Sequence, residues 1–301
     1  MTQSDGGSAA IDNLRGGAWV LLSAMCFVAM TTMVKFLGTG YSAEVQTFYR
    51  QLAGLIVLGP IMIARGWSVF AARRWGLMLF RSAAQSLGFI LSFYSFQVLP
   101  LADANALSFT RALWVVPLAI LFLREKLGLA QSILTVVGFG GALVMLNPGE
   151  TSFGWGQATA LIAAFLIAAT NISVKSLSRD QGIVTLVIWS SLLGAIFTAP
   201  FAIAEAHVPG VHDLLLLLVM GTLGVAAQIC NVRGLKIGEA SVIVPIDYTR
   251  LIFAVLIGSM FFGERPNQAT LIGATIIIAA TVLLGILEYR KRPRIPLADI
   301  E

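Results

Sequence analysis

Apolar stretches of membrane-spanning length dominate this sequence. A helix needs about 20 mainly apolar residues, at ~1.5 Å each, to cross the hydrocarbon core of a bilayer. Because helices satisfy their own backbone hydrogen bonds in lipid, such stretches predict an all-α integral membrane protein. Ten stretches meet this criterion, with short connections that carry proline and glycine, and they are expected at residues 16–37, 44–63, 76–98, 101–123, 128–146, 155–175, 183–203, 213–234, 239–262 and 267–288.

The composition excludes several other classes of protein. The chain has 301 residues, of which 57% are hydrophobic and 12% are charged, about half the charged fraction of a soluble domain. Cys26 and Cys230 lie far apart in apolar stretches, and His207 and His212 share one loop, so no disulfide framework, metal site or cofactor is expected. The net charge of +5 forms no basic patch with interleaved aromatics, so no nucleic-acid partner is expected either.

The positions of Lys and Arg predict the orientation in the membrane. With the N-terminus in the cytoplasm, fifteen of these residues, Arg81 among them, fall on the inner side, and only Lys35 and Arg265 fall on the outer side. Such an excess on the cytoplasmic side is typical of membrane proteins. Both termini are therefore expected in the cytoplasm, which requires an even number of spans.

The two halves of the chain resemble each other at a spacing of about 140 residues. Gly54 in the second stretch matches Gly194 in the seventh, and Arg111 matches Arg250 at a spacing of 139. Each half contains five expected spans, an odd number, so the second half enters the membrane from the opposite side. Inverted repeats of this kind recur in secondary transporters, where substrate binds between the repeats near the bilayer midplane.

This repeat defines four expected parts of the chain. The two middle parts are the five-helix repeats, and the outer parts are tails on the cytoplasmic side. The parts are a disordered tail at 1–15, a first repeat at 16–147, a second repeat at 148–288 and a basic tail at 289–301.

Several motifs resemble those of the EamA type of the drug/metabolite transporter superfamily. They are L-P-L-A-D-A-N-A-L-S-F-T at 99–110, P-L-A-I-L-F-L-R-E-K-L at 117–127 and F-F-G-E-R at 261–265. The resemblance covers roughly residues 16–288 and is nearest to proteobacterial carriers of metabolites such as riboflavin or S-adenosylmethionine. It implies a location in a bacterial inner membrane, a cavity lined by both halves, and peripheral fifth and tenth helices.

Four charged side chains are expected within the spans. Arg111 and Arg250 lie near the middle of the fourth and ninth stretches, Asp247 precedes Arg250 by three residues, and Arg50 lies near the outer end of the second. A charge at membrane depth normally faces a cavity or a partner. The arginines are candidates to bind a carboxylate or phosphate of the substrate. The alternatives are that Asp247 and Arg250 only fix helix packing, and that Arg50 extends to the interface.

Neutral side chains supply a second group of candidates for substrate contact. Polar residues in membranes also join helices to one another, and aromatic rings also fill cores, so each candidate has a packing alternative. The group consists of Gln85, Asn105, Ser108, Trp114, Asn171, Gln228 and Tyr248.

Two prolines and one glycine-rich run have structural interpretations. Pro117 and Pro245 lie close to the two arginines in the fourth and ninth stretches, where each removes a backbone hydrogen bond. They are therefore candidates for hinges in alternating access. The run at 138–141, G-F-G-G, predicts close helix packing, either within the chain or at a homodimer interface.

The sequence therefore favours a secondary transporter for a small-molecule substrate within the lipid bilayer. No G-x-x-x-x-G-K-[ST] motif for ATP hydrolysis occurs. The net positive charge of the candidate residues favours an anionic or zwitterionic metabolite, such as an amino acid, a flavin or a nucleoside derivative. The alternatives are an integral membrane enzyme, for which no catalytic cluster is seen, and a channel-like protein.

Overall fold

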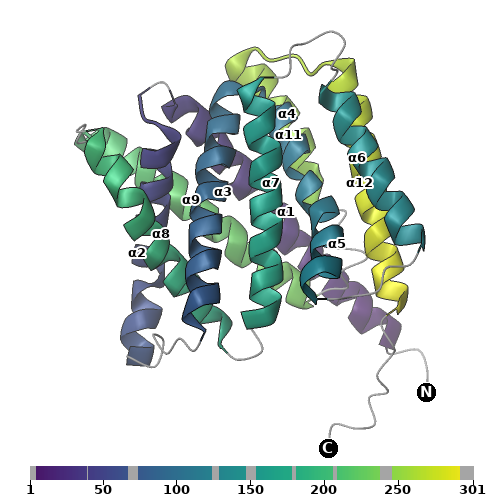
Figure 1. The fold of residues 1–301 in the computed structure, drawn as a ribbon, viewed down its shortest axis with the longest axis horizontal. Coiled ribbons are helices and arrows are strands. Elements are labelled where there is room, and N and C mark those ends of the chain that lie inside the picture. Colours follow the sequence, from purple (N-terminus) through teal and green to yellow (C-terminus); the bar gives the residue numbers. More distant parts are fainter. Residues whose placement is uncertain are drawn as a thin grey trace, which may run out of the picture.

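The computed structural model is a bundle of long helices (Figure 1). It describes residues 5–38, 40–66, 74–123, 129–146, 154–177, 181–205, 209–237 and 246–291, and no strand occurs among them. The helices are α1 (Asp5–Leu37), α2 (Ala43–Arg65), α3 (Trp75–Val98), α4 (Leu101–Ser108), α5 (Thr110–Leu123), α6 (Leu129–Leu146), α7 (Trp155–Leu177), α8 (Ile183–Ala204), α9 (Val211–Ile237), α11 (Thr249–Phe262) and α12 (Gln268–Lys291).

The apolar stretches form helices because a continuous helix pairs its own backbone groups. Seven segments of the described chain are long and apolar enough to cross a membrane, and three shorter apolar helices accompany them at 132–144, 249–262 and 268–284. Local signals set the helix ends. The hydroxyl of Ser42 accepts a hydrogen bond from the Val45 N–H, as an N-cap does, and Gly66 ends α2 with a φ of 58°.

The first helix begins earlier than the sequence indicated. Residues 1–15 were expected to be a disordered tail, whereas α1 already begins at Asp5. Extension of an existing helix costs little compared with its nucleation, and Ala9 and Ala10 are strong helix formers, so the apolar helix continues into its polar flank. The helix therefore begins within the expected tail, and the division of the chain into four parts stays a prediction.

The expected span at 101–123 is interrupted in the middle. Phe109 separates α4 from α5, and its N–H is bonded to the carbonyl oxygen of Ala106 at 3.1 Å in a tightened turn. Tyr248 occupies the corresponding turn before α11, where Leu251 N–H donates to its carbonyl oxygen at 3.0 Å. Phe109 and Tyr248 are 139 residues apart, the same spacing as Arg111 and Arg250. Both breaks therefore fall at matching positions of the two halves.

Several contacts between helices recur when each helix is replaced by the corresponding helix of the other half of the chain. Helix α1 packs along α9, and α7, the first helix of the second half, packs along α3. In the same way α2 contacts α9 while α8 contacts α3, and α1 contacts α11 while α7 contacts α5. The pairs α2–α8 and α6–α12 join corresponding helices directly. These contacts therefore recur when helices of one half are exchanged for their counterparts in the other, whereas the contacts of α3 with α1 and α2 have no counterpart of similar extent among the described helices.

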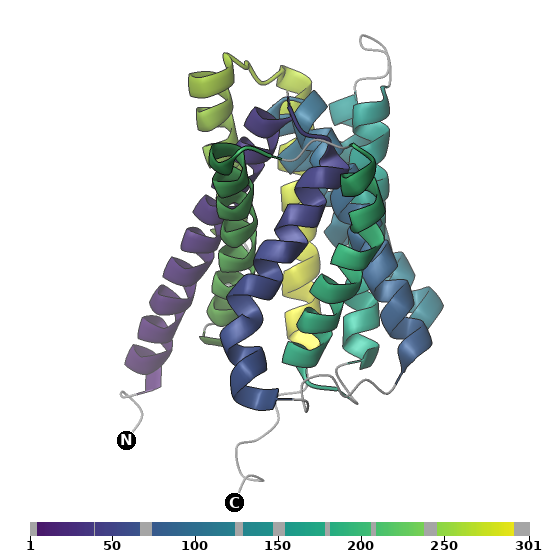
Figure 2. The same ribbon diagram turned by 90° about the vertical axis from the view of Figure 1, so that its left-hand side faces the viewer.

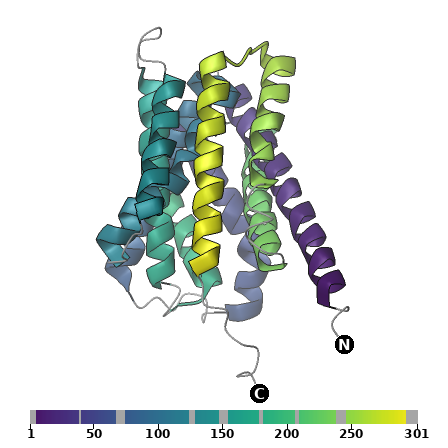
Figure 3. The same ribbon diagram turned by 90° about the vertical axis from the view of Figure 1, so that its right-hand side faces the viewer.

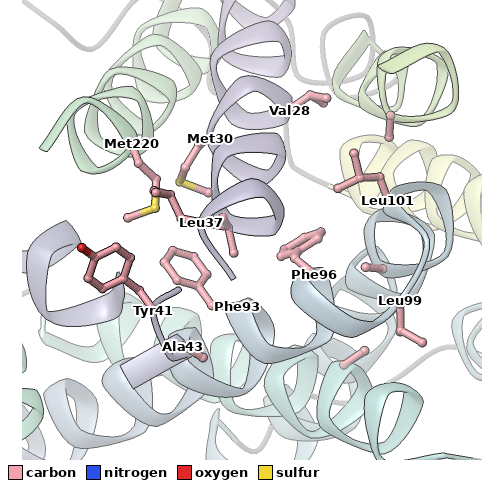
Figure 4. Close-up of a cluster of buried hydrophobic side chains, with 14 of the residues drawn as sticks. Val28, Met30, Leu37, Tyr41, Ala43, Phe93, Phe96, Leu99, Leu101 and Met220 are labelled. Atoms are coloured by element: carbon pink, nitrogen blue, oxygen red, sulfur yellow. The ribbon is translucent and has the colours of Figure 1, made fainter. Parts of the chain in front are cut away.

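The start of α1 and the end of α12 lie at the same end of the bundle, the lower end in Figures 2 and 3. At the upper end, buried side chains form a dense apolar cluster (Figure 4). In this upper cluster Phe93 and Phe96 of α3 meet Met30 and Leu37 of α1 and Met220 of α9. The upper cluster excludes water from the space between these helices.

Helices α6 and α12 form a separate pair at the side of the bundle (Figure 1). A Cβ atom at Gly141 would lie only 2.9 Å from the carbonyl oxygen of Gly273, so the glycine allows the backbones of α6 and α12 to approach closely. The glycine run at 138–141 is therefore used for packing within the chain. A homodimer interface stays a prediction.

Candidate functional site

A cavity of about 530 Å³ lies between the helices of both halves. Its lining comes from α1, α2, α3, α4, α5, α7, α8, α9 and α11, whereas α6 and α12 contribute no described residue to it. Along α7 it extends from Ala160 to Val174, which corresponds to roughly 20 Å at 1.5 Å per residue. Met30, Phe93 and Phe96 belong both to the cavity wall and to the upper cluster, so apolar packing covers the cavity toward the upper end.

Eight of the residues that the sequence indicated line this cavity. They come from separate helices, and the fold brings them together across distances of up to 200 residues in the chain. They are Arg50, Gln85, Ser108, Arg111, Asn171, Gln228, Asp247 and Arg250.

The three remaining candidates pack outside the cavity. Asn105 is fully buried, and its amide nitrogen donates to the carbonyl oxygen of Leu101 at 2.8 Å. The indole of Trp114 packs edge-on against Phe139 and Phe165, with ring centroids 4.7 and 5.2 Å apart. The ring of Tyr248 packs edge-on against Phe109, 4.8 Å away. These contacts favour the packing alternative for all three residues.

Asp247 is the carboxylate at the centre of the site. Its Oδ2 atom lies 2.5 Å from Nη2 of Arg250 and 3.7 Å from Nη2 of Arg111. The first pair is three residues apart on one helical turn, whereas the second joins the two halves of the chain. One carboxylate thus partly neutralises both arginines that the repeat relates.

The two arginines of this triad differ in their exposure. The Arg250 side chain is only 3% exposed, and its guanidinium carbon lies 4.6 Å from the ring centroid of Phe27 and 5.0 Å from that of Phe109. The Arg111 side chain is 33% exposed and faces the cavity. Arg250 is therefore fixed by aromatic packing and its ion pair, while Arg111 keeps donors available for a ligand.

Arg81 is the principal site residue that the sequence analysis missed. Counting Lys and Arg assigned it to the inner surface, but its side chain is 5% exposed and lines the cavity. Its Nη1 atom donates to the carbonyl oxygen of Leu186 at 2.9 Å and to the hydroxyl of Ser190, both on α8. The spacing of Arg81, Gln85 and Phe89, four residues apart on one face of α3, is the signal that could have found it.

An ion pair closes the upper end above the cavity. Lys35 at the end of α1 pairs with Glu264, and its Nζ also donates to the carbonyl oxygen of Leu99 at 2.5 Å. The other carboxylate oxygen of Glu264 accepts the Leu101 N–H at 2.7 Å. Gly263, with a φ of 65°, ends α11 in the left-handed conformation that turns Glu264 toward these partners. This upper latch, formed by Lys35, Glu264, Leu99 and Leu101, joins the two halves.

Pro117 and Pro245 were the two expected hinge positions, and only Pro117 lies within the described residues. Pro117 lies inside α5, which continues through it to Leu123, and the interruption of this span occurs at Phe109 instead. Pro245 lies outside the described residues. The hinge at Pro117 stays a prediction, and Phe109 is the position at which the regular α-helical hydrogen bonding is interrupted.

Comparisons with known proteins agree with this geometry. A family model described as "EamA-like transporter family" matches residues 14–147 and again 154–286. The chain is 28% identical over 281 residues to an S-adenosylmethionine uptake transporter of Rickettsia felis, covering 93% of this chain and 96% of the relative. It is 26% identical to a riboflavin transporter of Vibrio cholerae, with coverage of 93% and 96%.

A solved crystal structure shares the fold. It superposes with a TM-score of 0.62 at 19% identity, covering 95% of this chain and all of the other. The family model accounts for nearly all of the helical bundle, in two successive matches that divide it at the middle. The chain is thus a multi-pass membrane protein with a small-molecule substrate, a transporter rather than an enzyme, and it belongs to the EamA-like transporter family.

Proposed function

We propose that this protein is a secondary transporter that moves an anionic or zwitterionic organic metabolite across a bacterial inner membrane by alternating access. The observation that carries the proposal is the cavity between the halves. Among the described residues, four arginines and one aspartate line this cavity. Four positive charges against one negative charge favour a substrate that carries a carboxylate or phosphate.

Alternating access has a structural basis in the two halves. We infer ten spans in two inverted five-helix repeats, with both termini in the cytoplasm. Support comes from the helix contacts that recur on exchange of the halves, from the matching interruptions at Phe109 and Tyr248, and from the two family-model matches. Interrupted helices at mid-membrane are a recurring feature of carrier binding sites.

The relatives suggest the size and chemistry of the substrate. Transporters named for S-adenosylmethionine and for riboflavin are both similar over most of the chain. Both of those molecules combine a planar heteroaromatic ring with a hydroxylated group derived from a sugar. A cavity of about 530 Å³ lies within the range of pockets that enclose ligands of that size. We infer that the substrate is a metabolite of about this size. The candidates are an amino acid, a flavin and a nucleoside derivative.

The test is uptake by the purified protein in proteoliposomes. Labelled amino acids, flavins and nucleoside derivatives are compared for the wild type, Arg111→Ala and Arg250→Ala. Arg233→Ala serves as the matched control, because Arg233 is exposed on α9 and is not part of the cavity lining. We expect Arg111→Ala to raise KM about tenfold or more, since a lost charge-assisted hydrogen bond has about that effect.

A counterflow measurement distinguishes a carrier from a channel. In a carrier, unlabelled substrate on the far side of the membrane accelerates entry of labelled substrate, because the loaded protein reorients faster than the empty one. In a channel, the far side has no such effect. Uptake without trans-stimulation, or normal uptake by both arginine variants, would contradict the proposal.

A further inference from the structure

One face of α3 carries a polar stripe that the Asp247 triad does not involve. Arg81, Gln85 and Phe89 follow one another at intervals of four residues, so they lie on the same side of the helix. All three line the cavity. Arg50 of α2 joins them, because its guanidinium carbon lies 3.7 Å from the centroid of the Phe89 ring.

Arg81, a residue of the cavity lining, retains unused hydrogen-bonding capacity. A guanidinium carries five N–H donors. The Leu186 carbonyl and the Ser190 hydroxyl both accept from Nη1 of Arg81, and its buried Nε atom has no partner among the described residues. The Oε1 atom of Gln85, one turn along, is likewise buried without a described partner, and as an acceptor it suits a hydroxyl or N–H group of the ligand rather than its anionic group. A buried polar group without a partner is costly, so a ligand that supplied one would bind favourably.

Arg50 has the same property on the other side of the stripe. Its side chain is 8% exposed, and its Nε atom has no hydrogen-bond partner within the described part of the chain. Gly224 of α9 leaves space for it, since a Cβ atom there would lie 3.2 Å from that Nε. Phe89 lies eight residues beyond Arg81, so the two arginines approach α3 at levels roughly 12 Å apart.

The distribution of charge separates this stripe from the triad. Asp247 is the only carboxylate among the described lining residues, and it is already paired with Arg111 and Arg250. Arg50 and Arg81 have no carboxylate partner within the described chain, and both are more than nine-tenths buried. Two buried, uncompensated guanidinium groups beside a cavity are the arrangement that binds an anionic ligand group most strongly.

We propose that Arg81 and Gln85 on α3, together with Arg50, form a subsite for the anionic end of the substrate: Arg81 contacts the carboxylate or phosphate, and Arg50, farther along the stripe, adds to the positive potential that attracts it. This inference rests on the proposed transport function and deepens it. Phe89 holds the Arg50 guanidinium in place by cation–π stacking, and Ser190 holds that of Arg81. The Asp247 triad then contacts the remainder of the molecule.

The test uses pairs of probes that differ in one anionic group. The pairs are riboflavin and riboflavin 5′-phosphate, adenosine and adenosine 5′-monophosphate, and glutamine and glutamate. Equilibrium binding to the purified protein is measured for each member. In at least one pair we expect the wild type to bind the anionic member about tenfold or more tightly than its neutral counterpart.

Four variants localise this preference. Arg50→Gln and Arg81→Gln remove one guanidinium each and should reduce the preference about tenfold or more. Gln85→Glu places a carboxylate one turn from Arg81 without removing its bonds to α8, so it should abolish the preference while the melting temperature stays close to that of the wild type. Arg81→Lys keeps the positive charge but loses the planar guanidinium. It should therefore retain part of the preference for the anionic probe that Arg81→Gln loses.

The control and the contrary outcomes are distinct. Arg233→Gln makes the same change of charge outside the cavity and should leave the preference intact. The proposed subsite is wrong if the wild type binds the neutral and anionic members of every pair equally, or if Arg50→Gln and Gln85→Glu retain the preference for the anionic member. In either case, transport of any probe would still support the proposed transport function. If no probe is bound or transported, both the subsite and the proposed substrate class are wrong.

Discussion

The upper latch makes a quantitative prediction about how the protein opens. Glu264→Gln keeps an oxygen to accept the Leu101 N–H but removes the charge that pairs with Lys35. The side chains of Lys35 and Glu264 are only 15% and 14% exposed, so Lys35 would be left partly buried and uncompensated. Breaking a fully buried ion pair costs about 3–5 kcal/mol, and this pair retains some solvent, so we expect about 2 kcal/mol.

That free energy acts on a conformational equilibrium as well as on stability. The upper latch joins the end of α1 and the α3–α4 connection to the α11–α12 connection, so it exists only while the upper end is closed. Weakening it by about 2 kcal/mol raises the ratio of upper-open to upper-closed molecules about thirtyfold. The magnitude stays within the range of coupling free energies that shift conformational populations.

Cysteine accessibility measures this shift. In a background of Cys26→Ala and Cys230→Ala, Ser95→Cys places a thiol at a cavity position that is 2% exposed, adjacent to Phe96 of the upper cluster. A membrane-impermeant maleimide added from the upper face should label it at least tenfold faster when Glu264→Gln is present.

The matched control removes a different carboxylate at the same end of the bundle. Glu205, exposed at the end of α8, takes no part in the upper latch, and Glu205→Gln should leave the labelling rate unchanged. Equal labelling rates in Glu264→Gln and the wild type would refute the role of the ion pair in closure. Equal acceleration by both variants would show that surface charge, rather than the latch, controls the rate.

Two further predictions concern packing and pH. Gly141→Ala would place a Cβ atom 2.9 Å from the backbone carbonyl oxygen of Gly273, which cannot move aside as a flexible side chain can, so it should destabilise the protein by about 1–3 kcal/mol in thermal unfolding, whereas Gly59→Ala, with open space around it, should not. The hydrogen bond to Asp213 raises the pKa of Tyr41 to about 12, from an ordinary 10. The bond's contribution to stability should therefore be complete below pH 10 and be lost as pH rises toward 12, an effect that Tyr41→Phe abolishes in pH-dependent unfolding.

The helices were predictable because their signal is local. An apolar run of about 20 residues specifies a helix in lipid whatever its neighbours are, and most expected boundaries fall within two residues of the observed ones. The interruption at Phe109 was not predictable in this way. The turn there is accompanied by edge-on packing against Tyr248, a contact across 139 residues that a pattern within one stretch does not contain.

The site residues were predictable only where depth in the membrane was clear. Arg111 and Arg250 lie at the middle of their stretches, and both line the cavity. Arg81 lies six residues after the start of α3, close enough to the surface that a count of basic residues assigned it to the cytoplasmic side. Its burial depends on Leu186 and Ser190 of α8, more than 100 residues away in the chain, so only the packed structure places it in the site.

The two halves of the chain differ in charge at one matching pair of cavity positions, and this difference adds to the net positive charge of the lining. At the spacing of 139 that relates Arg111 to Arg250, Asp247 corresponds to Ser108, and both line the cavity. Ser108→Asp would give Arg111 a carboxylate three residues away, as Arg250 already has, and would lower the net charge of the lining by one. We expect it to weaken binding of anionic probes about tenfold, while Ser108→Asn, similar in size to Asp but uncharged, changes it little. Equal effects of the two substitutions on probe binding would mean that steric fit, and not charge, governs this part of the cavity.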